Sequence, residues 1–278
     1  CNLRQIVVYC KRVKFETAVT RSAGEFIFMA GQITVRGIRF DSVSLGEAVA
    51  RCRAMLETDG VSVIHTPNAE IAQMCQEHPE YLDVYNDADL IIPDGIGVIA
   101  AARILGTPLT AGKVAGIDLC RELIAYCAQT GYGVFLLGGK PGVAEEAAAA
   151  LEKQYIGLHI CGVHDGYFTD DRPVIQKINE SGADLLLVCL GVPKQELWIA
   201  AHRKELTGVR LTGGFGGTLD VFAGRVRRAP QIFIRLGLEW LYRLIREPRR
   251  IRRMMKIPKF LAGTVRCRLR GSRHTVGS

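Results

Sequence analysis

Short apolar segments alternate with segments of helical periodicity through most of the chain. Six apolar segments predict strands, at 61–66, 90–93, 133–137, 158–163, 185–190 and 209–212. Segments with apolar residues every three or four positions predict helices, at 69–86, 98–105, 117–129, 143–155, 173–181 and 195–206. Alternating strands and helices are typical of a parallel sheet covered by helices on both faces, so the predicted fold class is α/β.

Two further elements are predicted ahead of this alternation. Apolar and polar residues alternate in part over 33–43, and Gly37 falls where a turn would reverse the chain, so a short β-hairpin is predicted. Ser44 is followed three residues later by Glu47, which is the pattern of a capping box at the start of a helix over 45–58.

The length and composition fit one α/β domain with appended segments. The chain has 278 residues, 48% of them hydrophobic and 23% charged, so most of it should fold. No run of about 18 apolar residues occurs, and no membrane-spanning helix is predicted. We expect a poorly ordered leader at 1–32, a core at 33–224 and a C-terminal appendage at 225–278. The nine cysteines include no Cys-x-x-Cys pair, which favours reduced thiols over disulfides or a zinc site.

Positive charge is concentrated in the appendage. Residues 225–278 contain 16 Lys and Arg against two acids, a net charge of +14, whereas the rest of the chain has a net charge of −6. Apolar residues recur every three or four positions over 231–246 and again after Pro248, with arginines between them. A basic amphipathic segment of this kind predicts contact with an anionic membrane surface.

Two other interpretations of the appendage follow from the same pattern. Its first helix could simply pack on the core and turn an arginine-rich face to solvent. A nucleic-acid partner is not expected, because no nucleic-acid-binding fold signature accompanies the charge.

Polar residues and glycines follow the predicted strands. Thr66 and Asn68 come after the first strand, and Asp94 and Gly95 come after the second. The carboxyl ends of parallel strands meet at one edge of a sheet, where ligands bind, so we predict a crevice there for a polar, phosphorylated ligand. Asp94 at that edge is a candidate general base.

Each of these residues also has a purely structural interpretation. Asp94 could cap the helix that follows it, and Thr66 and Asn68 could be turn and cap residues. Gln195 and Glu196 open a predicted helix and could likewise only satisfy its backbone.

Two motifs suggest other chemistry with a poorer fit. Residues 95–100 match the dinucleotide pattern G-x-G-x-x-A, but Asp118, the acid about 20 residues further on, opens a helix instead of ending a strand. Asp87 and Asp89 form an Asp-x-Asp pair that precedes its strand and so lies at the wrong end of the sheet. The histidines share no metal-like spacing. We therefore predict no metal and no cofactor, and expect cationic side chains and helix N-termini to bind any diphosphate leaving group.

Six motifs in order carry a resemblance to a known family. They are Thr66-Pro67-Asn68-Ala69-Glu70, Pro93-Asp94-Gly95-x-Gly97, Val114-Ala115-Gly116-x-Asp118-Leu119, Gly191-x-Pro193-Lys194-Gln195-Glu196-x-Trp198, Arg227-Arg228-Ala229-Pro230 and a longer one over 237–250. With them, the chain resembles the WecG/TagA/CpsF family of bacterial glycosyltransferases from about residue 33 to residue 261. The resemblance implies a Rossmann-like core, with a mostly parallel sheet between helices, and an appendage that meets the membrane and closes the site.

The resemblance also implies an inverting hexosyltransferase, peripheral at the cytoplasmic face of the bacterial membrane. Typical members move N-acetylmannosamine from UDP to the N-acetylglucosamine of an undecaprenyl-diphosphate lipid, in teichoic acid synthesis. Others transfer N-acetylmannosaminuronic acid or glucose for other surface polysaccharides. The implied partners are a UDP-sugar donor, the undecaprenyl-diphosphate-linked acceptor and an anionic membrane surface, without a metal; a homo-oligomer is left open.

Carried over to this sequence, the resemblance makes Asp94 the base that deprotonates the acceptor hydroxyl. Five residues fall in the implied substrate pocket: Thr66, Asn68, Gly95, Gln195 and Glu196. Three appendage arginines are implied to bind the UDP diphosphate: Arg243, Arg250 and Arg253. Lys113, a further implied substrate-binding residue, stands where the family usually has Arg, and lysine lacks the planar fork for bidentate phosphate contact.

Two other classes of protein stay open at the level of the sequence. The glycine pattern at 95–100 allows an NAD-dependent oxidoreductase. A non-catalytic membrane-binding scaffold would need only the basic appendage.

Overall fold

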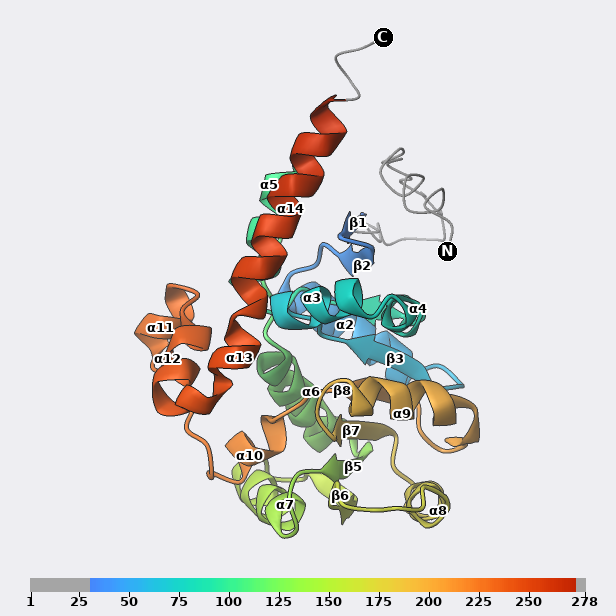
Figure 1. Cartoon of the computed structure of the whole chain (residues 1–278). Helices are drawn as coiled ribbons and strands as arrows, with labels where there is room; N and C mark the ends of the chain where they lie inside the picture. Colours follow the sequence, from blue (N-terminus) through green and yellow to red (C-terminus); the bar gives the residue numbers. More distant parts are fainter. Residues whose placement is uncertain (1–30, 274–278) are drawn as a thin grey trace.

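Six parallel strands form the central sheet of the computed structural model, which describes residues 31–273 (Figure 1). The strands are β3 (Ser62–His65), β4 (Leu90–Ile91), β5 (Gly133–Gly138), β6 (His159–His164), β7 (Leu185–Cys189) and β8 (Leu211–Gly214). Their order across the sheet is β4-β3-β8-β7-β5-β6. All six strands predicted from the apolar segments are confirmed, as is their parallel arrangement.

Helices cover both faces of this sheet because successive strand residues point to opposite sides. One face is covered by α2 (Leu45–Leu56), α6 (Gly116–Thr130) and α7 (Val143–Gln154), and the other by α8 (Arg172–Glu180) and α9 (Lys194–His202). In β7, Leu185 and Leu187 pack in the first layer, whereas Leu186 and Val188 pack in the second. The predicted α/β class with helices on both faces is therefore confirmed.

A third apolar cluster joins the N-terminal hairpin to the appendage. It is built from β1 (Gln32–Val35), β2 (Ile38–Asp41), α3 (Ala69–Glu77), α5 (Ile96–Leu105) and α14 (Lys256–Arg273). Phe260 of α14 is fully buried in it. The helix therefore docks on the core through α3 and α5, and its far end projects from the body of the molecule (Figure 1).

The local turn and cap signals are confirmed. The hairpin reverses at Gly37, whose φ of +89° is a left-handed value that glycine adopts without steric cost. The Ser44 hydroxyl accepts a hydrogen bond from the Glu47 N–H, and the Glu47 carboxylate accepts one from the Ser44 N–H, which completes the predicted capping box.

Two predicted helices are each divided in the structure. The helix expected over 69–86 is α3 followed by α4 (Glu80–Asn86), because Pro79 disfavours helical backbone at the residue before it. The helix expected over 231–246 is α11 (Gln231–Arg235) followed by α12 (Glu239–Arg246).

The second break has a packing cause. Gly237, between α11 and α12, has a φ of +70°, and an added Cβ there would lie 3.1 Å from Cβ of Ile96. The chain thus turns where the appendage presses against the start of α5, and it needs glycine to do so.

Smaller differences concern helix ends and short turns. The helix predicted over 195–206 ends as α9 and continues as the 3₁₀ turn η1 (Arg203–Glu205). The short helix α10 (Thr218–Phe222) was not predicted, and the segment expected to be helical after Pro248 begins as two short elements, η2 (Pro248–Arg250) and α13 (Ile251–Met254). The helical pattern expected after Pro248 reaches much further than residue 261, because α14 extends to Arg273.

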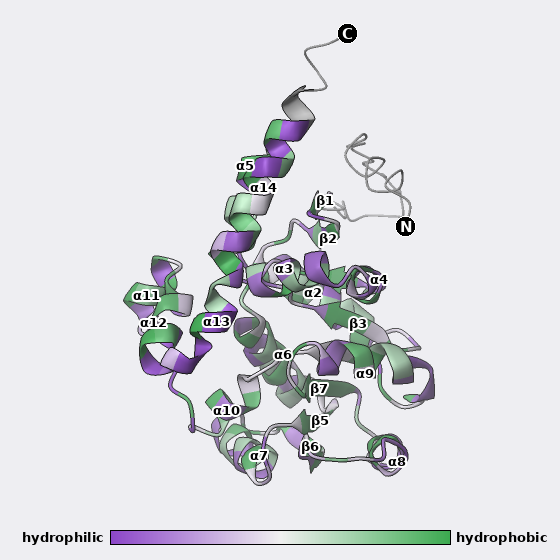
Figure 2. Ribbon diagram, viewed as in Figure 1, coloured by the Kyte–Doolittle hydropathy of each residue, from purple (hydrophilic) through white to green (hydrophobic). Residues whose placement is uncertain are grey.

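Most of the leader predicted at 1–32 lies outside the described residues; Gly31 and Gln32 are described, and Gln32 begins β1. Six of the cysteines that the structure describes are free thiols, in line with the prediction for them: Cys52, Cys75, Cys120, Cys127, Cys161 and Cys189. Polar and apolar residues mix along the appendage helices (Figure 2). Within the described part of the chain, no helix combines the length and the hydropathy that crossing a membrane requires.

Candidate active site

The ends of β4, β3, β8 and β7 form one continuous edge, and the candidate site lies on it. The Thr66 hydroxyl, just after β3, donates to the carbonyl of Gly214 at the end of β8, over 3.5 Å. The Asp94 N–H, after β4, donates to the Pro67 carbonyl over 3.4 Å. The chain leaves β4 at the sheet margin and re-enters at β5 beyond β8 and β7, so this edge includes the point where the strand order reverses.

Asp94 has a free carboxylate on this edge. Its side chain accepts no hydrogen bond and forms no ion pair with any of residues 31–273. Burial raises its pKa to about 6; the charges of Arg243 and Lys113 oppose this, while that of Glu239 adds to it. At neutral pH the group is therefore a mostly ionised base with nothing bound to it.

The helix that follows Asp94 does not use it as a cap. The cap position of α5 is Gly95, whose φ of +87° favours glycine, and no side chain caps that helix. The structural interpretation of Asp94 is therefore wrong, and the carboxylate is left available. Gly95 contributes backbone conformation rather than a side chain.

Asn68 has the structural role that the sequence left open. Its side-chain oxygen accepts a hydrogen bond from the Ile71 N–H over 3.0 Å and caps α3. Thr66 lies nearby against Gly116 at the start of α6, where an added Cβ would approach its hydroxyl to 3.2 Å. Direct contact of these two side chains with a substrate stays a prediction.

Gln195 and Glu196 lie deeper than the other candidate residues, and each is only 2% exposed. The Gln195 amide donates to the Glu196 carboxyl over 2.8 Å and accepts from the Gly216 N–H over 3.0 Å. An added Cβ at Gly214 would come within 2.5 Å of that amide, so the glycine makes room for it. Gln195 thus packs under the strand ends, with Glu196 behind it.

The buried surroundings bring the titration of Glu196 into the neutral range. Burial raises its pKa to about 7, against the effect of its hydrogen bond with Gln195, so the carboxyl is about half protonated at pH 7. The Tyr85 ring lies beside it, and His65 contacts that ring edge-on at 5.2 Å between centroids. Burial also lowers the pKa of His65 to about 4, so its imidazole is neutral at pH 7.

The appendage is held on this edge by an ion-pair network next to Asp94. Lys113 donates to the Glu239 carboxylate of α12 over 2.8 Å and to the Ile234 carbonyl over 3.3 Å. Arg228 binds both oxygens of Asp118, at 2.5 and 2.6 Å, and its Nε lies 3.8 Å from Glu239. The core contributes Lys113 and Asp118 to this contact, and the appendage contributes Glu239 and Arg228. The network lies within electrostatic range of Asp94.

The three appendage arginines implied for diphosphate binding lie in different places. Arg243 lies one helical turn after Glu239, and its positive charge opposes the rise in the pKa of Asp94. Arg253 forms an ion pair with Glu70 of α3 at 2.6 Å. Arg250 binds Glu247 within its own turn at 2.6 Å and makes no hydrogen bond or ion pair to residues 31–224.

Three residues of the site were not assigned by the sequence: Asp118, Arg228 and Glu239. Each stands in one of the motifs that carry the family resemblance, which was the available signal. Their pairing could not be read from spacing, because Asp118 and Arg228 are 110 positions apart in the chain.

The other motifs weighed in the sequence lie away from this edge. Asp89, at the start of β4, accepts a hydrogen bond from the Val63 N–H and pairs with Arg203, so it lies at the amino end of the strands, as predicted. Within residues 31–273, no group of three or more His, Cys, Asp and Glu side chains is arranged to hold a metal ion.

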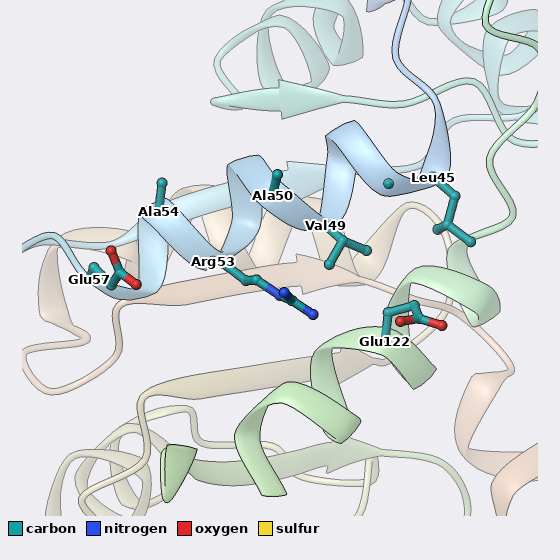
Figure 3. Close-up of a pocket in the computed structure, with 8 residues that line it drawn as sticks. Leu45, Val49, Ala50, Arg53, Ala54, Glu57 and Glu122 are labelled. Atoms are coloured by element: carbon teal, nitrogen blue, oxygen red, sulfur yellow. The ribbon is translucent and has the colours of Figure 1, made fainter. Parts of the chain in front are cut away.

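A cavity of about 530 Å³ lies between α2 and α6 (Figure 3). Its lining includes Leu45, Val49 and Arg53 of α2 and Glu122 of α6. None of the candidate site residues lines it.

A parallel α/β sheet with helices on both faces, a carboxylate at its carboxyl edge and a basic appendage docked there defines the class of protein: a Rossmann-like α/β protein with a candidate active site at the sheet edge. The model of the glycosyl transferase WecG/TagA/CpsF family matches residues 33–274, and the chain belongs to this family. It is therefore a glycosyltransferase. The match extends past residue 261, where the resemblance stated from the sequence ends.

Two curated relatives support this assignment. One from Bacillus spizizenii is 39% identical over 211 residues, which cover 76% of this chain and 81% of the relative. One from Bacillus subtilis is 38% identical over 199 residues, which cover 72% of this chain and 77% of the relative. Both are named N-acetylglucosaminyldiphosphoundecaprenol N-acetyl-beta-D-mannosaminyltransferase.

Charge exchange should show whether Lys113 acts through Glu239. Lys113→Glu and Glu239→Lys should each lower the initial rate of glycosyl transfer at least tenfold, because each places like charges across the core–appendage contact. The double exchange should recover most of the rate, since the ion pair re-forms with opposite polarity. A matched control is the exchange of Arg225 and Glu146, a more exposed pair at 2.7 Å, which should change the rate less than twofold. No recovery in the double variant would mean that Lys113 itself binds substrate.

Glu196→Gln should stabilise the protein at alkaline pH. A carboxyl whose pKa rises from 4.5 to about 7 on folding favours the folded state below pH 4.5, and this contribution is lost as pH rises through 7. The amide cannot ionise, so the variant should gain on the order of 1–3 kcal/mol over the parent at pH 8 and little at pH 5. Urea unfolding at the two pH values measures this, with exposed Glu152→Gln as control. An equal effect at both pH values would contradict a neutral buried Glu196.

Proposed function

We propose that the protein transfers N-acetylmannosamine from a UDP donor to the N-acetylglucosamine of undecaprenyl-diphosphate-N-acetylglucosamine, with inversion at the anomeric carbon. The names of two relatives, at 39% and 38% identity over most of both chains, support this acceptor and this sugar. The product would enter teichoic acid or another cell-surface polysaccharide.

The observation that carries the proposal is the free carboxylate of Asp94. A glycosyl acceptor is a neutral alcohol, and its attack on the anomeric carbon requires removal of a proton as the new bond forms. Asp94 has a pKa of about 6 and no bound partner among the described residues, so it can accept that proton at neutral pH. The hydroxyl oxygen then bonds to the anomeric carbon, and UDP leaves with the electron pair of the broken bond.

The arrangement of carboxylates supports inversion. Two acidic groups, Asp118 and Glu239, raise the pKa of Asp94. Asp118 is held in an ion pair with Arg228, and Glu239 in one with Lys113. One free base suits a single displacement, whereas a double displacement needs a second carboxylate as nucleophile. A single displacement inverts the configuration.

Cations near Asp94 support departure of the nucleotide. The negative charge that builds on the leaving diphosphate would be stabilised by Arg243, which α12 holds within electrostatic range of Asp94. This role requires the appendage to be docked, so residues 225–278 act as part of the enzyme. We keep the expectation that no metal takes part.

We also propose that the protein is peripheral at the inner face of the cell membrane. Ile232 and Leu236 in and after α11 and Ile245 in α12 are 65%, 64% and 63% exposed, on the segment with the strongest positive charge. Apolar side chains with arginines around them fit the headgroup region of an anionic bilayer. The polyprenyl acceptor is found there.

Asp94→Asn tests the proposed chemistry directly. The amide keeps the size of the side chain but cannot accept the proton, so the rate of UDP release should fall about 10²–10⁴-fold. The assay uses UDP-N-acetylmannosamine and a prenyl-diphosphate-N-acetylglucosamine analogue, with EDTA present. Exposed Asp59→Asn is the control and should be unaffected. The parent's rate should also fall as pH drops below about 6, the pKa of Asp94.

The same assay separates the other candidate functions. UDP-glucose and the UDP form of N-acetylmannosaminuronic acid are run in parallel, and faster transfer from either would replace the proposed donor. UDP, and not NAD, should raise the melting temperature. Full activity of Asp94→Asn would refute the role of this carboxylate.

Vesicle sedimentation tests the membrane proposal. The parent should bind vesicles rich in phosphatidylglycerol and not vesicles of phosphatidylcholine alone, because arginines need anionic headgroups. Changing Ile232, Leu236 and Ile245 together to Gln should weaken binding several-fold, since about 0.8 kcal/mol is lost per CH₂ group withdrawn from the bilayer. The control changes Ile156 and Tyr167, two exposed residues outside the appendage, to Gln. Equal loss in both proteins would contradict binding through α11 and α12.

A further inference from the structure

A second cavity, of about 280 Å³, lies where the core and the appendage meet. Its apolar lining comes from Ile71 and Met74 of α3 and from Val192 in the loop after β7. Ile71 and Met74 are 6% and 9% exposed, so the hollow is backed by the packed core. We call this cavity the α3–α13 pocket.

Charged residues form the rest of the lining, and positive charge predominates. Arg252 and Arg253 of α13 and Lys256 of α14 face Glu70 of α3. An apolar floor with a cationic rim is complementary to an anion joined directly to hydrocarbon. A nucleoside diphosphate has no such hydrocarbon.

The pocket is lined by residues close in sequence to two candidate site residues. Asn68, which caps α3, precedes Glu70 by two residues, and Gln195 follows Val192 by three. Lys113 and Arg243 are not among its lining residues, and both act electrostatically on Asp94. The cations therefore form two groups, one with Arg243 around Asp94 and one around the α3–α13 pocket.

Two separate cationic groups fit a reaction that brings two diphosphates together. The donor and the acceptor each carry one, and like charges in a water-poor cleft repel strongly unless each has its own counter-charges. The donor diphosphate leaves beside Asp94. The second group is then available to the acceptor, whose diphosphate is attached directly to a polyprenyl chain.

The charges of the pocket leave room for such an anion. Arg253 is paired with Glu70 at 2.6 Å, and Lys256 with Glu77 at 3.3 Å. Arg252 makes no hydrogen bond or ion pair with the residues that the structure describes. The two cations are partly exposed, with 51% of the Arg253 side chain and 32% of the Lys256 side chain accessible, so a diphosphate could compete with these carboxylates for them.

The surface beyond the pocket offers a path for the hydrocarbon. Ile251 and Met255 flank the pocket arginines on the chain and are 48% and 59% exposed. Both belong to the appendage, which we propose to meet the bilayer.

We propose that the α3–α13 pocket binds the diphosphate and the first isoprene units of the lipid acceptor, and that Arg253 belongs to this acceptor site and not to the donor site implied by the family resemblance. This inference rests on the proposed function, since it names the place of the acceptor in that reaction.

The double variant Arg252→Gln, Lys256→Gln tests it in the full-length protein. With a detergent-soluble farnesyl-diphosphate-N-acetylglucosamine acceptor, the KM for acceptor should rise at least tenfold. The KM for the UDP-sugar and the kcat should stay within twofold. Arg253→Gln should also raise the KM for acceptor. The control is Arg246→Gln, Arg249→Gln, which removes the same charge from exposed appendage positions outside the pocket and should leave both KM values unchanged.

Two outcomes would overturn the inference: a rise in the donor KM with the acceptor KM unchanged, or an equal rise of the acceptor KM in the control. Binding of farnesyl diphosphate, measured by calorimetry, gives a reading without catalysis. It should be at least tenfold weaker in the Arg252, Lys256 variant than in the control. If no UDP-sugar supports transfer by the parent, the proposed function fails, whereas farnesyl diphosphate binding equal in the variant and the control rejects the pocket alone.

Discussion

The docking of a basic appendage on the carboxyl edge of the sheet is the constraint on which the site depends. Residues 1–224 have a net charge of −6, and a body of that charge is poorly suited to bind two diphosphates. The appendage has a net charge of +14. The ion pairs of Arg228 with Asp118 and of Lys113 with Glu239 hold this positive charge at a fixed place on the core. Because each pair joins core and appendage, the raised pKa of Asp94 and the cations around it arise together.

The fold was predictable from the sequence to the extent that it follows local periodicity. The six buried strands and the helices between them repeat a pattern that burial imposes, and the capping box of Ser44 and Glu47 is a local contact. The two divided helices show the limit of periodicity. The apolar stripe over 231–246 is continuous in sequence, yet the chain turns at Gly237 because the start of α5 lies against it.

The site was predictable only where strand ends determine position. The order of elements suffices to place Asp94, Thr66 and Gln195 at one edge. It does not show that Gln195 and Glu196 turn inward beneath that edge, because only the close approach of Gly214 makes space for the amide. Nor does it separate the arginines: Arg243 and Arg253 share one basic segment, but Arg243 acts electrostatically on Asp94, whereas Arg253 pairs with Glu70 of α3.

That separation would matter for how the proposed reaction avoids hydrolysis of the donor. In the proposed scheme Asp94 must deprotonate the sugar hydroxyl and not water, so an appendage that docks most firmly when both substrates are bound would protect the donor. Two cationic groups on one appendage would give this coupling, because each bound diphosphate would neutralise its own group. The exposed apolar residues of α11 and α12 would add contact with lipid as a third contribution, if they meet the bilayer as we propose. On these proposals, the candidate base, the cations beside it and the α3–α13 pocket would act together at the bilayer surface.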